Sequence, residues 1–104
     1  MLSIINKETK QEGILEGLDR LTALNAHIVK EELTKYLSVP NVIFTLNMEN
    51  IRFIDSTGIG VLISAYKTAH MNNGIFLLSN VNKEVMTLLT LMKLDKVFNF
   101  ADDI

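Results

Sequence analysis

The sequence has no cysteine among its 104 residues, only one proline and two histidines. Without cysteine the chain can form no disulfide, no thiolate metal site and no cysteine nucleophile. The histidines, His27 and His70, lie in predicted helices and stand in no motif with metal-ligand spacing. We therefore expect both to be ordinary surface residues, and we predict no metal site.

The chain also lacks a strong excess of either charge and any long apolar run. Ten basic residues against twelve acidic ones give a formal net charge of -2, and the lysines are scattered along the chain. We expect neither nucleic acid nor a membrane as a partner. Residues 1–11 lack the pattern of a secretion signal, and no apolar stretch approaches the roughly 18 residues of a membrane span. These absences predict a cytoplasmic protein.

No repeat, low-complexity tract or linker divides the sequence, and its hydrophobic content of 48% is enough for one core. We predict a single domain over residues 1–104. Its first two apolar segments, 2–6 and 14–18, indicate strands. The polar residues 7–11 between them predict the turn of a hairpin.

After the hairpin, helical and strand patterns alternate. From Thr22 the apolar spacing is helical, and this helix has to stop before Pro40. Residues 42–46 are β-branched and apolar, which is typical of a strand buried on both faces. The elements predicted after it are an irregular stretch at 47–55, a helix ending at 72–74, a strand at 75–78, a helix capped by Asn82 and a strand at 97–100.

This order of elements predicts an α/β fold. Strands that alternate with helices favour parallel pairing with right-handed crossovers. We therefore expect an open mixed sheet of four or five strands, parallel in its second half, with the helices packed mainly on one face.

Groups that could carry out catalysis are scarce. Gly58 and Gly60 lack both the third glycine of a dinucleotide fingerprint and the Gly-Lys-Ser/Thr end of a P-loop. The carboxylate pairs Glu31-Glu32 and Asp102-Asp103 lie on a helix and at the terminus, so neither forms an acid/base pair. We predict no enzymatic activity and no cofactor. A small nucleotide-binding enzyme on a flavodoxin-like sheet is the least favoured alternative.

Residues 53–60 concentrate polar and small side chains where a buried segment turns into an apolar helix. Free backbone N–H groups and the helix dipole favour negative charge at such a junction, and glycines let another molecule approach the backbone. The other interpretation is that Asp55 or Ser56 simply caps the helix. The pattern alone leaves both interpretations open.

Residues 51–62, Ile-Arg-Phe-Ile-Asp-Ser-Thr-Gly-Ile-Gly-Val-Leu, resemble the signature of the STAS domain family, an apolar run followed by Asp-Ser-Ser/Thr-Gly and an apolar helix. Residues 17–23 are similar to the family's early Gly-x-Leu-Asp…Ala element, and residues 73–77 stand where the family enters its next strand. The resemblance covers nearly the whole chain and implies the STAS fold. Within the family it points to the stand-alone bacterial anti-sigma factor antagonists.

The resemblance implies a phosphorylation switch. In such antagonists the serine of the Asp-Ser motif is phosphorylated by a partner kinase that is also the anti-sigma factor, and a metal-dependent phosphatase removes the phosphate. The unphosphorylated form binds the kinase and frees the sigma factor. Carried over by position, the serine is Ser56, with Thr57 as the alternative acceptor. The expected partner-binding residues are Asp19, Asp55, Ser56, Thr57, Gly58, Ile59 and Gly60.

Two further expectations concern this segment. Replacing Gly58 by valine or leucine should block the kinase while the domain stays folded. Replacing Ser56 by alanine should cost a helix cap, roughly 0.5–2 kcal/mol. The alternative function is a constitutive STAS interaction subunit of another regulatory or transport complex, in which Ser56 is only a cap.

Overall fold

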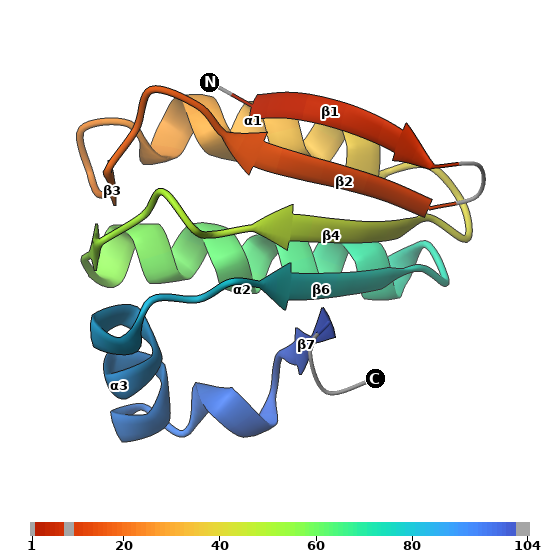
Figure 1. Cartoon of the computed structure of the whole chain (residues 1–104). Helices are drawn as coiled ribbons and strands as arrows, with labels where there is room; N and C mark the ends of the chain where they lie inside the picture. Colours follow the sequence, from red (N-terminus) through yellow and green to blue (C-terminus); the bar gives the residue numbers. More distant parts are fainter. Residues whose placement is uncertain (1, 8–9, 102–104) are drawn as a thin grey trace.

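The computed structural model describes residues 2–7 and 10–101 of the chain. Its main sheet has five strands in the order β1-β2-β4-β6-β7 (Figure 1). The strands are β1 (Leu2–Lys7), β2 (Lys10–Leu15), β4 (Ile43–Asn47), β6 (Ile75–Ser79) and β7 (Asn99–Phe100). Only β1 and β2 pair antiparallel, and the other neighbours are parallel. The predicted mixed sheet, parallel in its second half, is confirmed.

The helices lie mainly on one face of this sheet, as expected. They are α1 (Ala26–Leu37), α2 (Ser56–Met71), α3 (Lys83–Leu91) and the 3-10 turn η1 (Leu94–Lys96). In Figure 1, α1 and α2 run side by side behind the strands, and α3 lies at the end of β6. No helix within the described residues combines the length and apolar character needed to cross a membrane.

The core lies between the sheet and the two long helices. The Phe44 ring lies 6.0 Å from the Tyr36 ring of α1 and 6.5 Å from the Phe76 ring of β6, measured between centroids. Phe44 and Leu46 are buried, whereas the alternate residues of β4 are only half-buried. The prediction that this strand is buried on both faces is therefore wrong, because helices cover one face of it.

The predicted hairpin is confirmed, but the second strand begins four residues earlier than its apolar pattern indicates. Residues 10–14 pair with β1 on one side and β4 on the other, so backbone pairing extends the strand through polar positions. Residues 8 and 9 of the predicted turn lie outside the described residues. Gly17, with φ 76°, makes the turn that ends the region, a conformation glycine adopts readily.

Helix α1 begins at Ala26, not at Thr22 as predicted, because residues 22–25 form a turn. The Asn25 Oδ1 accepts a hydrogen bond from the Thr22 backbone N–H (3.1 Å), and its Nδ2 donates to the Arg20 carbonyl (2.9 Å). Such local bonds offer the backbone an alternative to the helix. The end of α1, before Pro40, is where we expected it.

A second, two-stranded sheet is absent from the sequence prediction. Strand β3 (Arg20–Leu21) pairs parallel with β5 (Phe53–Ile54), which falls inside the stretch expected to be irregular. Two-residue strands carry no readable alternation. This small sheet brings residues about thirty positions apart to the start of α2.

Asn82 stands at the predicted cap position of α3 but does not cap the helix with its side chain. Its Nδ2 instead donates to the carbonyls of Glu49 (3.3 Å) and Ile51 (2.5 Å). The side chain thereby ties the start of α3 to the segment that enters β5.

Asn82→Ala should therefore lower the free energy of unfolding by about 1–3 kcal/mol. The reason is that the backbone carbonyl of Ile51, a buried residue, loses its hydrogen-bond donor. Urea denaturation measures this loss. The matched control is Asn99→Ala, at an exposed position, which should change the stability by about 0.5 kcal/mol or less. Equal stability of the two variants would contradict the role of Asn82.

Candidate functional site

The first turn of α2 is held by the carboxylate of Asp55, the N-cap residue. Its Oδ1 accepts a hydrogen bond from the Gly58 backbone N–H (2.8 Å). Its Oδ2 accepts one from the Ala23 backbone N–H (3.1 Å), in the turn before α1. One side chain therefore fixes the starts of two helices relative to each other.

These hydrogen bonds lower the pKa of Asp55 below its ordinary value of 3.8. The bond from Gly58 is the largest cause, desolvation opposes it, and the bond from Ala23 adds to the lowering. The carboxylate is therefore ionised at neutral pH. A negative group at this position also interacts favourably with the helix dipole.

Ser56 and Thr57 are exposed on the first turn of α2, and the helix begins within residues 53–60 as predicted. Among the described residues, the Ser56 hydroxyl takes part in no hydrogen bond. Asp55 supplies the cap, so the expectation that alanine at position 56 costs a helix cap is wrong.

Gly58 and Ile59 are buried. A Cβ atom at Gly58 would overlap the Leu21 carbonyl oxygen of β3 and lie 2.7 Å from the Ile54 side chain. The absence of a side chain thus admits the chain's own backbone, not another molecule. Valine or leucine at position 58 would disrupt the fold, which contradicts our expectation of a folded variant.

Gly60, unlike Gly58, has free space around it. It is exposed, and a Cβ atom there would meet nothing within 4 Å. It contributes to a groove of about 400 Å³ between the first halves of α1 and α2. The groove is lined by Ala23, Ala26, His27, Lys30, Thr57, Gly60 and Val61. Its small residues leave room for a partner's side chain, and two of its lining residues are basic.

Asp19 lies at the same end of the molecule, beside Arg20 and Phe53, whose contact the sequence analysis did not predict. Its backbone carbonyl accepts a hydrogen bond from the Arg52 N–H (2.7 Å), and its Oδ1 lies 3.5 Å from the Arg20 Nε. The Arg20 guanidinium lies 5.9 Å from the ring centroid of Phe53, its cross-strand neighbour, in a cation-π arrangement. Phe53 is 54% exposed. Arg20 and Phe53 are brought together by the pairing of β3 with β5, which no local sequence pattern predicts.

Metal-ligating side chains are not grouped here. The described residues contain no cluster of three or more histidine, aspartate or glutamate side chains that could hold a metal ion. The candidate site therefore consists of the exposed Ser56 hydroxyl on the first turn of α2, the groove beside Gly60, and the surface formed by Arg20 and Phe53.

The two glycines of α2 make a matched pair for testing this geometry. Gly58→Ala should lower the free energy of unfolding by about 1–3 kcal/mol or more, since its Cβ overlaps the Leu21 backbone. Gly60→Ala should instead raise it by about 0.5–1 kcal/mol, because alanine favours the helix and meets no neighbour. Urea denaturation measures both, and stability changes of the same sign would be inconsistent with the close approach at Gly58.

The lowered pKa of Asp55 predicts a pH-dependent stability. Such a carboxylate stabilises the fold above the pKa of the unfolded chain, and the contribution is lost as pH falls through the lower, folded pKa. Asp55→Asn keeps the shape of a capping residue but removes the charge. Its melting temperature should lie below that of wild type at neutral pH, with the gap narrowing as pH falls below 3.8. A gap that stays constant with pH would contradict this account.

The chain is similar in sequence to a curated protein. The anti-sigma F factor antagonist of Paenibacillus polymyxa is 33% identical over 58 residues, which make up 56% of this chain and 50% of that protein. The aligned region is therefore only about half the length of this curated relative.

Two solved structures share the fold. A candidate anti-sigma factor antagonist from Thermotoga maritima superposes with a TM-score of 0.77 at 25% identity, covering 95% of this chain and 84% of that one. A sulfate transporter family protein from Wolinella succinogenes gives a TM-score of 0.68 at 23% identity, over 86% and 77% of the two chains. The family model of the STAS domain matches residues 4–104, nearly the whole length. The chain therefore belongs to the STAS domain family.

Proposed function

We propose that this protein is an anti-sigma factor antagonist that is switched by phosphorylation of Ser56. The observation that carries the proposal is the exposed Ser56 hydroxyl on a helix start fixed by Asp55 and Gly58. The similarity to the P. polymyxa antagonist supports the same role. Unphosphorylated, the protein binds an anti-sigma factor that is also a serine kinase, and the sigma factor is released in the cytoplasm.

The geometry suits a protein substrate of a kinase. Phosphoryl transfer depends mainly on positioning the acceptor against the nucleotide phosphate and its magnesium, which the partner supplies. A hydroxyl on a fixed turn, with no internal hydrogen bond among the described residues, needs little rearrangement to be placed. In this proposal the protein itself performs no catalysis, and a metal-dependent phosphatase of the cell resets it.

The chemistry of the surroundings gives the direction of the switch. A phosphate on Ser56 adds about -1.5 to -2 charge beside the ionised Asp55. Burying that charge against a partner without a matching cation costs several kcal/mol. Ser56 is not among the residues that line the groove with His27 and Lys30, whereas Thr57 is. In this proposal, phosphate at Ser56 stands beside Asp55 and outside the lining of the groove, and it acts as the release signal.

The direct test is incubation of the purified protein, with ATP and magnesium, with each anti-sigma factor kinase encoded in the same genome. Peptide mass mapping should find phosphate on Ser56 of wild type and none on Ser56→Ala. The alanine variant should keep the wild-type unfolding free energy within about 0.5 kcal/mol, because Asp55 is the cap. It should bind the kinase persistently, and Ser56→Asp should bind less well. Modification of the alanine variant would move the acceptor to Thr57 or elsewhere.

Gly60 provides an independent test of the docking surface. Gly60→Trp fills the groove with a large ring at an exposed position and should weaken kinase binding by at least about tenfold, or 1.4 kcal/mol. Gly60→Ala is the matched control and should bind like wild type. Calorimetric titration measures both, with circular dichroism to confirm folding. Undiminished binding of a folded Gly60→Trp variant would exclude the groove from the interface.

A second candidate function is a constitutive interaction subunit of a transport complex. The structural similarity to the W. succinogenes sulfate transporter family protein favours it. In that case protein isolated from its native cells should carry no phosphate on Ser56 under any growth condition. It should also be recovered with a transporter in detergent extracts of the membrane fraction.

A further inference from the structure

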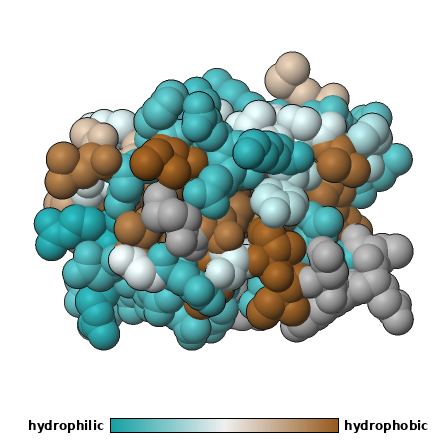
Figure 2. Space-filling view, turned by 90° about the horizontal axis from the view of Figure 1, so that it is seen from above, coloured by the Kyte–Doolittle hydropathy of each residue, from teal (hydrophilic) through white to brown (hydrophobic). Residues whose placement is uncertain are grey.

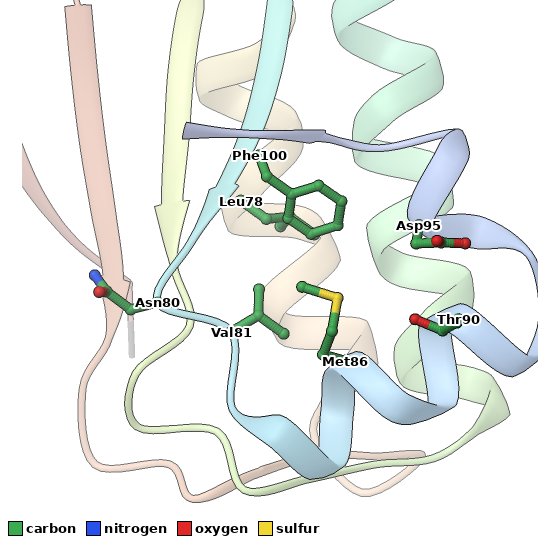
Figure 3. Close-up of a pocket in the computed structure, with 7 residues that line it drawn as sticks. All are labelled: Leu78, Asn80, Val81, Met86, Thr90, Asp95 and Phe100. Carbon is green, nitrogen blue, oxygen red and sulfur yellow. The ribbon is translucent and has the colours of Figure 1, made fainter. Parts of the chain in front are cut away.

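A separate cavity lies at the carboxyl ends of β6 and β7, against α3 and η1 (Figure 3). It measures about 340 Å³ and is lined by Leu78, Asn80, Val81, Met86, Thr90, Asp95 and Phe100. Crevices at the carboxyl ends of parallel strands are where open α/β sheets bind their ligands. None of the lining residues belongs to α2 or to the Asp55 turn, so this cavity is independent of the site around Ser56.

Four of the seven residues that line the cavity are apolar. Leu78 is fully buried, and Val81, Met86 and Phe100 are half-buried. Figure 3 shows these four side chains converging on the centre of the cavity from β6, the segment after it, α3 and β7. A thioether and a phenyl ring provide an adaptable surface that suits a flat or short apolar group.

One side of the cavity is polar. Asp95 of η1 and Thr90 of α3 lie on that side in Figure 3. Asp95 is half-buried, and among the described residues neither its carboxylate nor the Thr90 hydroxyl has a hydrogen-bond or ion-pair partner. A carboxylate that is partly removed from water and lacks a counter-ion is favoured by a cationic donor. The hydroxyl can accept a second hydrogen bond from the same group.

We propose that this cavity binds a small amphipathic amine. Its ammonium group donates to Asp95 and Thr90, and its apolar group packs between Met86 and Phe100. The volume is at the lower end of the range for small-molecule pockets, about 300–1,000 Å³, which limits the ligand to a single ring or a short chain. A neighbouring groove over α3 shares Val81, Met86 and Thr90 with the cavity.

The probe for this test is 2-phenylethylamine, and its uncharged isostere 2-phenylethanol is the matched control. Titration of the ¹⁵N-labelled protein, followed by amide chemical shifts, should show saturable changes around residues 78–81, 86–90 and 95–100. The amine should bind about tenfold more tightly than the alcohol, the difference expected for a charge-assisted hydrogen bond.

Asp95→Asn keeps the shape of the side chain and removes its charge, so it should abolish the preference for the amine. Glu16→Gln, which also removes one carboxylate but at an exposed position outside the cavity, should retain the preference. Equal affinity for amine and alcohol, an amine preference that survives Asp95→Asn, or the absence of saturable shifts at the cavity would each overturn the proposal. These measurements use the protein without a kinase, so their outcome does not depend on whether Ser56 is phosphorylated.

Discussion

The site depends on one interaction, the carboxylate of Asp55 shared between the Gly58 and Ala23 backbone N–H groups. It joins the start of α2 to the turn before α1, and Gly58 lets the same helix turn approach the Leu21 backbone closely. Together these contacts align the first halves of two helices, which is what creates the groove beside Gly60. Ser56 is exposed on this turn, and among the described residues its hydroxyl makes no hydrogen bond.

Much of the fold follows from periodic patterns in the sequence. The apolar runs at 42–46 and 75–78 and the apolar face of α2 are local signals, and their alternation was enough to predict parallel pairing. The small β3–β5 sheet was not predictable in this way, because each strand has two residues and its stability comes from a distant partner. The polar start of β2 was missed for the same reason, since neighbouring strands on both sides impose its extended conformation. Figure 2, turned to view the molecule from above Figure 1, shows a face that is hydrophilic over much of its area and carries several apolar groups across its middle.

The start of the helix that carries Ser56 was predicted in position, but the structural roles of its residues were not all predicted. The Asp-Ser-Thr-Gly motif placed the helix start and the exposed serine correctly, because capping chemistry is local. The function of Gly58 was misjudged, since its necessity arises from Leu21, which lies 37 positions earlier. Arg20, Phe53 and the α1 side of the groove reach the site only through tertiary structure. The family resemblance supplied the serine's expected modification, which no distance or burial in the chain could supply alone.

The central claim is that a partner kinase docks on the joined starts of α1 and α2 and is released by phosphate on Ser56. Hydrogen exchange of the backbone amides tests it most directly, comparing the free protein, the protein with the kinase that modifies it, and the phosphorylated protein with the same kinase. The account predicts added protection within residues 20–30 and 53–61 in the unphosphorylated complex, and loss of that protection after phosphorylation. Protection confined to α3 or to the open face of the sheet, or protection that persists after Ser56 is phosphorylated, would contradict it.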